Sequence, residues 1–155
     1  MKPVYILLIA VFLGMTSKSV AVPPYPPTKA QLVSGAPIVA IVTITNLITE
    51  NFSIRTNQIM QQKADLIVEE VLKGSLTEPA RLRYYILKNQ QIGCNPPRLF
   101  EGRCIVFLAS DGEFYARSND WPSLILIRND QVEWFTQPES LSASIINLKK
   151  LIAGP

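Results

Sequence analysis

The sequence predicts a mainly β domain that ends in a single amphipathic helix. Short runs rich in Val, Ile, Thr and aromatic residues recur through the middle of the chain, and clusters of Gly, Pro, Asn and Asp separate them. Such runs between turn residues are typical of strands. After Pro138 the apolar residues change to the spacing of a helix. The length that remains after the N-terminal segment suits one domain with a single core.

The first residues have the pattern of a secretory signal peptide. Lys2 precedes an apolar run at residues 4–15, and Ser19-Val20-Ala21 offers the small residues that signal peptidase accommodates. A run of about 12 residues is shorter than the roughly 20 that cross a bilayer. We therefore expect cleavage after residues 1–21 and a secreted or periplasmic protein without a stable membrane span.

A proline-rich tail is expected between the signal peptide and the domain, over residues 22–36. Residues 22–29 read VPPYPPTK, and four of these eight are proline. Such a segment takes an extended, polyproline-like form and is most often a spacer, although it could also be a ligand for an aromatic groove. We expect one domain over residues 37–153.

The first strand is expected at residues 38–46, which read IVAIVTITN. They are apolar on both faces at the start, so this strand should be central in its sheet. Residues 47–62 are polar and are expected to be irregular. They contain Asn51-Phe52-Ser53, a sequon for N-glycosylation that matters only where the source has that pathway.

The second strand is expected at residues 64–73. Val71 falls out of step with the inward face that Leu66 defines. A β-bulge near Glu69 and Glu70 would return Val71 to that face. A helix is the rival interpretation, because this stretch also contains strong helix formers.

The later strands include two hairpins. Residues 81–87 alternate between two faces, with Leu82 and Tyr84 on the inward one. Gly112 and residues 129–131 (Asn-Asp-Gln) are typical of turns between paired strands. The paired strands are expected at residues 105–109 with 114–116, and at residues 124–128 with 132–135.

The C-terminal helix is predicted from four apolar residues at helical spacing. Ser140 can cap its N-terminus, and Gly154 can end it. The four residues are Leu141, Ile145, Leu148 and Ile152. Their common face would close the core.

The two cysteines, Cys94 and Cys104, are expected to form a disulfide. An exported protein can keep such a bond, and two cysteines allow one pairing. Closing a loop of about 11 residues would stabilise the fold by roughly 2–3 kcal/mol. A redox pair is the alternative, but catalytic pairs are usually separated by two residues, and here nine intervene.

Composition excludes several kinds of active site. Histidine is absent, which excludes Ser-His-Asp triads, Cys-His pairs and histidine-based metal sites. No glycine-rich phosphate or dinucleotide motif occurs. Carboxylates are the remaining candidates for a hydrolase, as two pairs close in sequence: Asp111 with Glu113, and Glu69 with Glu70. Asp is common in turns for local reasons, and adjacent residues of a strand face opposite sides. We expect a protein that is not an enzyme and has no cofactor or metal.

The charge of the mature chain argues against some partners. Removal of residues 1–21 would take away Lys2 and Lys18, which leaves 13 basic and 12 acidic residues. A chain so close to neutral is not suited to electrostatic capture of nucleic acid or acidic membranes.

The strand at residues 81–87 carries a candidate binding face. Arg81, Arg83 and Tyr85 point outward there, and such a stripe could bind a glycan or a small anionic ligand. Trp121 is a further candidate, since one tryptophan of this chain could be an exposed anchor. The alternative for the stripe is a solvated sheet face with cross-strand ion pairs, and we favour that alternative.

One order of motifs resembles a known family. A V-x-x-V-L-K-G motif at residues 68–74 precedes the alternating strand, and Gly93-Cys94, Glu101-Gly102 and an apolar strand follow. This order, over about residues 38–135, is similar to the netrin-like module of tissue inhibitors of metalloproteinases. The resemblance implies a small OB-like, closed or partly open β-barrel with a helix packed on it.

The resemblance does not imply inhibition of metalloproteinases. Those inhibitors hold the protease zinc with a cysteine at the mature N-terminus, and no cysteine precedes Cys94 in this chain. Our first expectation is therefore a non-enzymatic binding module that engages a protein partner outside the cytoplasm, through loops or a sheet edge. Glycan or small anionic ligand binding on the Arg81, Arg83 and Tyr85 face comes second, and a hydrolase third.

Overall fold

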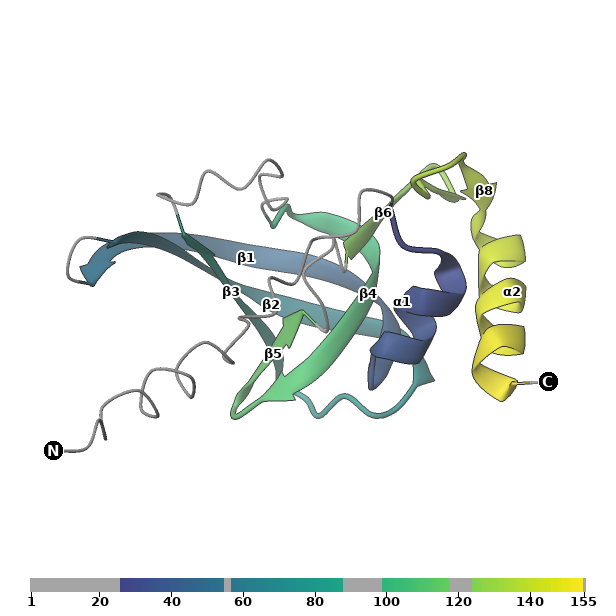
Figure 1. Cartoon of the computed structure of the whole chain (residues 1–155), viewed down its shortest axis with the longest axis horizontal. Helices are drawn as coiled ribbons and strands as arrows, with labels where there is room; N and C mark the ends of the chain where they lie inside the picture. The colour runs from purple at the N-terminus through teal and green to yellow at the C-terminus, as the bar shows by residue number, and fades with distance from the viewer. Residues whose placement is uncertain (1–25, 55–56, 88–98, 118–123, 155) are drawn as a thin grey trace, which may run out of the picture.

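A computed structural model describes residues 26–54, 57–87, 99–117 and 124–154 (Figure 1). Strands make up most of these residues, and a helix lies near each end of the described chain. The elements are α1 (Lys29–Gly35), β1 (Ile38–Ile54), β2 (Asn57–Lys73), β3 (Ala80–Leu87), β4 (Gly102–Asp111), β5 (Phe114–Arg117), β6 (Leu124–Arg128), β7 (Gln131–Val132), β8 (Glu139–Ser140) and α2 (Leu141–Ala153).

Five of the strands form a ring. Their order is β1-β2-β3-β5-β4, and β4 pairs back with β1. All the contacts are antiparallel except β3 with β5, where Leu82 pairs with Tyr115 in parallel. β6, β7 and β8 continue the sheet from β4. The expected fold class, mainly β and OB-like with one C-terminal helix, is confirmed.

The first hairpin is longer than the sequence suggested. The prediction that residues 47–62 are irregular is wrong for those that the structure describes, because β1 continues to Ile54 and β2 begins at Asn57. A register shift lies between Thr45 and Ile48, and Asn46 has a positive φ of 53°. Residue 46, predicted as the end of a strand, is therefore part of a bulge within one.

The predicted bulge in the second strand is confirmed. Between the pairs Ile41–Glu70 and Val42–Val68, β2 has one residue more than β1. The helix considered for this stretch does not form. Val71 nevertheless remains 38% exposed, so the bulge does not turn it inward as we expected.

The inner cluster of apolar side chains fills the ring. β1, β2, β3 and β4 contribute alternate residues to it, as the period of a strand requires. Its buried members are Ile38, Ala40, Val42, Ile44, Met60, Ala64, Leu66, Ala80, Leu82, Tyr84, Leu99, Cys104, Val106, Leu108 and Leu124.

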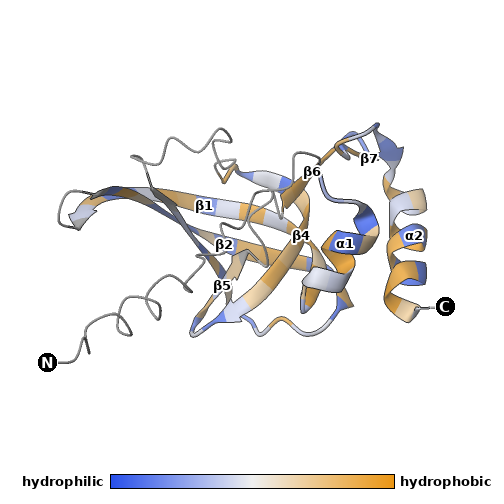
Figure 2. Ribbon diagram, viewed as in Figure 1, coloured by the Kyte–Doolittle hydropathy of each residue, from blue (hydrophilic) through white to orange (hydrophobic). Residues whose placement is uncertain are grey.

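The outer cluster lies between the ring and the two helices. β4 has cores on both faces, because Ile105 and Phe107 point to the outer cluster while their neighbours point inward. In Figure 2, apolar residues accordingly run along β4, and α2 alternates apolar with polar residues. The buried members are Leu32, Val33, Ala36, Val39, Ile41, Ile105, Phe107, Ile125, Ile127, Val132, Trp134, Leu141 and Leu148.

Helix α1 corrects the expected domain boundary. Residues 22–36 were assigned to a tail ahead of the domain, but α1 lies in this range and buries Leu32 and Val33. Thr28 and Gln31 form a capping box at its start. The Lys73 Nζ atom donates a hydrogen bond of 2.7 Å to the carbonyl of Val33 near its end. The folded domain therefore begins before residue 37.

The C-terminal elements agree with the sequence in most respects. α2 begins after Ser140, whose Oγ accepts a hydrogen bond of 3.3 Å from the Ala143 amide, and Gly154 follows it with φ of 73°. β5 pairs with β4 as a hairpin through a turn that contains Gly112, with φ of 64°. The predicted strand at 132–135 is shorter, since β7 ends at Val132.

Candidate functional site

The far end of the β1–β2 hairpin projects beyond the ring (Figure 1). β4 stops pairing with β1 at the Ile44–Gly102 pair, while β1 continues to Ile54. We call residues 48–54 with residues 57–63 the arm. Within the described chain, β1 in the arm pairs with β2 alone, so its other edge has no partner strand.

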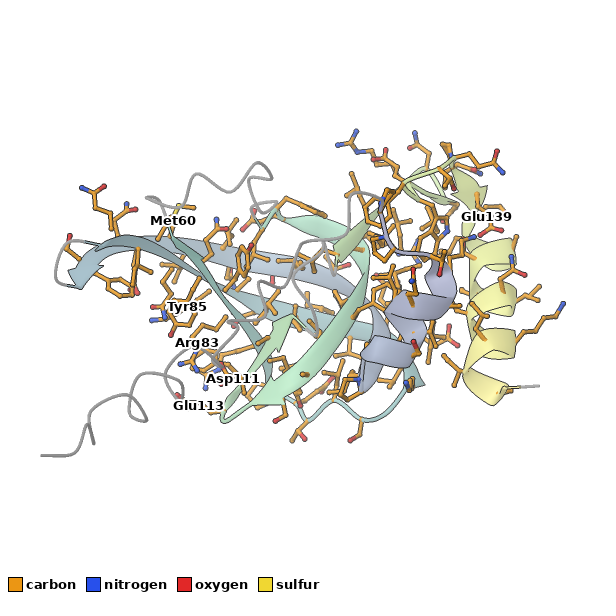
Figure 3. All side chains as sticks on the ribbon, viewed as in Figure 1. Met60, Arg83, Tyr85, Asp111, Glu113 and Glu139 are labelled. Atoms are coloured by element: carbon orange, nitrogen blue, oxygen red, sulfur yellow. The ribbon has the colours of Figure 1, made fainter. Side chains whose placement is uncertain are left out.

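The two faces of the arm differ in environment. Met60, labelled in Figure 3, and Gln62 are buried on the inner face, where the Gln62 amide oxygen accepts a hydrogen bond of 2.9 Å from the Leu99 amide. Ile48 and Phe52 lie on the outer face and are 56% and 36% exposed. The inner face is therefore part of the core, and the outer face presents apolar side chains to solvent.

Residues of β3 extend this outer face. Tyr85 lies opposite Gln61, and Arg83 lies opposite Lys63. Tyr85 is 46% exposed, and the Lys63 Nζ atom lies 3.1 Å from Glu50 Oε2. The outer face of the arm and β3 thus combines exposed apolar groups with charged side chains that form ion pairs.

The two arginines of the predicted binding stripe are engaged by carboxylates from the β4–β5 hairpin (Figure 3). The Arg83 Nη2 atom lies 2.8 Å from Asp111 Oδ2, and the Arg81 Nη2 atom lies 3.6 Å from Glu113 Oε2. Both guanidinium groups lie over the ring of Phe114, with Cζ 4.6 Å and 5.0 Å from its centroid. Hydrogen bonding to Asp111 raises the pKa of Arg83 above its usual value.

This geometry limits what the stripe can bind. An anionic ligand would compete with Asp111 for Arg83, and two cations and two anions here compensate one another. The cross-strand ion pairs that we favoured as the alternative are therefore present. Sequence reasoning also considered Asp111 and Glu113 as catalytic carboxylates, and the structure places both beside arginines.

Two of the predicted site residues, Trp121 and Cys94, lie outside the described residues. The disulfide therefore stays a prediction, and Cys104 has no disulfide partner in the described part of the chain. Cys104 is fully buried in the inner cluster. Burial raises the pKa of its thiol to about 12, and the nearby charge of Glu69 acts in the same direction. The other tryptophan, Trp134, belongs to the core.

A polar network joins α1 and α2 at the border of the outer cluster. The Ser144 Oγ atom is fully buried, accepts a hydrogen bond of 2.9 Å from Trp134 Nε1 and donates one of 2.6 Å to Glu139 Oε2. Lys29 forms an ion pair with the same carboxylate oxygen and lies over the Trp134 ring at 4.7 Å. Asn147 donates a hydrogen bond of 2.8 Å to the other oxygen of Glu139.

The network fixes the ionisation of Glu139. Burial alone would raise the pKa of this carboxyl, but hydrogen bonds from Lys29, Ser144 and Asn147 outweigh burial and lower its pKa below the usual value. Ser144 cannot reach a substrate because it is buried. The network is therefore structural, and it connects the start of α1 to β8 and α2.

Comparison with known proteins adds no assignment. The chain matches no protein-family model, and no curated protein matches it significantly in sequence. Residues 26–54, 57–87, 99–117 and 124–154 contain no group of three or more Cys, Asp or Glu side chains that could hold a metal ion. Neither α1 nor α2 is long and apolar enough to cross a membrane.

Sequence reasoning missed Ile48 and Phe52. In a strand, Ile48, Glu50 and Phe52 lie on one face, and Thr49 and Asn51 lie on the other. Both apolar residues then share a face, and this spacing was the available signal. The strand period is difficult to recognise here, because a segment with so many polar side chains also has the composition of a loop. A long strand with one solvated face tolerates such residues.

Proposed function

We propose that this protein is an exported, non-enzymatic binding module that engages a protein partner outside the cytoplasm through the arm. The signal-peptide pattern of residues 1–21 supports the compartment. The observation that carries the proposal is the exposure of Ile48 and Phe52 on a hairpin that extends past the ring. Apolar side chains displayed together on a projecting element are suited to docking.

The energetics favour a protein partner over a small ligand. Burying an exposed apolar side chain contributes roughly 1.5–3 kcal/mol, and aromatic residues are common anchors of protein interfaces. The edge of β1 beside these residues also offers backbone donors and acceptors to an added strand. A projecting hairpin with an exposed strand edge fits an extended partner segment better than it encloses a small molecule.

Binding of a glycan or a small anionic ligand on the Arg81, Arg83 and Tyr85 face remains the second candidate. The half-exposed ring of Tyr85 supports it, since sugars stack on aromatic rings. The ion pairs of Arg81 and Arg83 weaken it, because a ligand must displace Glu113 and Asp111.

A matched pair of variants tests the first candidate. Ile48→Ser with Phe52→Ser removes the apolar side chains of the arm, and Ile146→Ser removes an equally exposed isoleucine from α2. Chemical cross-linking in the exported fraction of the source cells, followed by mass spectrometry, should identify a protein captured by the wild type and the Ile146→Ser variant. The arm variant should lose it.

Two results would reject the arm as the docking surface. One is the same captured protein for all three chains. The other is the absence of any captured protein together with a glycan ligand whose binding Tyr85→Ala abolishes, which would favour the second candidate.

A further inference from the structure

In the described part of the chain, the edge of β1 in the arm that faces away from β2 has no partner strand, and its sequence lacks the devices that usually protect such edges. Natural edge strands carry lysine, proline or charges that discourage pairing with another chain. Residues 48–54 read ITENFSI and contain no lysine, arginine or proline. Their single charge, Glu50, is already in an ion pair with Lys63 of the same arm. The bulge at Asn46 lies before this segment begins, and the described pairs from Ile48 to Ile54 contain no further register shift.

We infer that two copies of this protein pair through this edge, with β1 of one copy antiparallel to β1 of the other. This inference deepens the proposed function, since it names a second copy as a partner of the arm. Antiparallel pairing of one strand with its own copy is compatible with the two-fold symmetry that most homodimers have. The pairing would join the two arms into one continuous sheet.

The apolar residues select the register of this pairing. When the two-fold axis passes beside Glu50, Ile48 of each copy lies directly opposite Phe52 of the other, and both pairs are on the outer face. An aromatic side chain opposite a β-branched one is among the favourable cross-strand pairs. The two Glu50 carboxylates meet at the axis, where each has Lys63 of its own arm at 3.1 Å to offset their repulsion.

Charge does not oppose this association. The mature chain expected after signal cleavage is within one charge of neutral, so two copies repel each other little. The contact is limited to about seven residues of one strand, and such a small interface gives a weak, concentration-dependent dimer. In that dimer the outer faces of the two arms remain open and form a wider apolar surface for a third chain.

The register is tested by a charge-exchange design. Ile48→Lys and Phe52→Asp are made singly and together, in protein produced by a host without N-glycosylation, because a glycan on Asn51 would cover the edge. Within one copy, positions 48 and 52 are about 13 Å apart along the strand and cannot pair with each other. Across the two-fold axis, the introduced lysine at position 48 faces the introduced aspartate at position 52.

Sedimentation and light scattering measure the mass over a concentration series up to the millimolar range. We expect the wild type and the control Ile146→Lys to approach twice the monomer mass, each single arm variant to remain monomeric, and the double arm variant to dimerise again. Circular dichroism confirms that each variant is folded, and rescue by the double variant separates lost pairing from lost structure.

Three outcomes overturn the inference. The first is a wild-type protein that stays monomeric throughout the series. The second is dimerisation that the single arm variants do not reduce. The third is a double variant as monomeric as the single ones. If the wild type is monomeric but the arm still captures another protein in cross-linking, this inference fails and the proposed function stands. If the dimer forms and no other protein is captured, this inference stands and docking of a different protein on the arm is rejected.

Discussion

The inner and outer clusters of this protein are both apolar, but different elements enclose them. Side chains of the ring strands supply most of the described members of the inner cluster, and Gln62, at the start of the arm, is buried beside them. Strands cover one side of the outer cluster, and two helices from distant parts of the sequence cover the other. On the helical side, a polar network connects Trp134, Ser144 and Glu139 by hydrogen bonds.

The two clusters differ in what fixes the positions of their side chains. Backbone pairing places the side chains of the inner cluster, so generic apolar residues of suitable size are sufficient. A backbone hydrogen bond of 2.9 Å from the Leu141 amide to the Asp130 carbonyl holds the start of α2, but packing alone leaves the position of the rest of the two helices less defined. Specific hydrogen bonds supply what is missing, because an unmatched buried polar group is costly and only one arrangement satisfies them all.

Deleting the largest fully buried side chain between the ring and the helices should cause the largest loss of stability. Phe107 is fully buried, and its ring lies 6.5 Å from that of Trp134. Phe107→Ala should lower the free energy of unfolding by about 3–5 kcal/mol, as measured by urea denaturation. It should also weaken the near-ultraviolet circular dichroism of Trp134.

The control is Phe135→Ala, at a residue that is 38% exposed, and it should change the free energy of unfolding by less than about 0.5 kcal/mol. Equal midpoints for the two variants would contradict this account of the outer core.

The expected disulfide would make the inner core depend on a covalent bond as well. If Cys94 and Cys104 are linked, reduction should lower the free energy of unfolding by about 2–3 kcal/mol. Alkylation in denaturant, with and without a reductant, counts the free thiols by mass. Two free thiols before reduction would exclude the bond. In that case Cys104 should resist alkylation in the folded protein, because its thiol is buried and has a pKa of about 12.

The polar network should have a smaller effect that depends on pH. Glu139→Gln removes the charge that pairs with Lys29 and weakens the acceptor for Ser144, and should cost about 1–3 kcal/mol at neutral pH. The folded-state pKa of Glu139 lies below that of the unfolded chain, so its contribution is present above the unfolded value of about 4.3. The contribution is lost as the pH falls through the folded-state pKa.

Denaturation series from neutral to acid pH test the sign of this effect. The wild type should lose more stability on acidification than Glu139→Gln, and the two should converge at the lowest pH. Some acid sensitivity should remain in the variant, because a hydrogen bond from Arg103 also lowers the pKa of Glu69. Glu113→Gln, at a side chain 73% exposed, is the control and should follow the wild type. Parallel curves for the wild type and Glu139→Gln would show that the network does not depend on this charge.

Several elements could be predicted from the sequence because their signals are local. The alternation around Leu82 and Tyr84, the cap at Ser140 and the turn at Gly112 each depend on a few neighbouring residues. The bulge beside Glu69 was predicted because an apolar period was out of step by one residue. Its consequence for Val71 was not, since a second register shift follows between Val39 and Ala40, on the other side of Val71.

The arm and α1 show where local signals fail. Asn46 looked like the end of a strand, but a bulge there lets the strand continue through a polar segment with one solvated face. Leu32 and Val33 are too few to predict a helix after a proline-rich run, and their burial depends on strands that follow later in the chain. The candidate binding residues Ile48 and Phe52 lie in the segment that was misassigned for this reason.

The sequence by itself determined most of the strands, the terminal helix and the absence of histidine chemistry, because hydrophobic period and capping depend on near neighbours and composition depends on no contact at all. The tertiary structure alone decided that β1 closes against β4, that Arg81 and Arg83 are engaged by Glu113 and Asp111, and that part of β1 has an edge without a partner strand in the described chain. Each of these features depends on residues that lie far apart in the chain. Such long-range contacts depend on which surfaces can be buried against one another once the strands have formed, and no local sequence pattern encodes them.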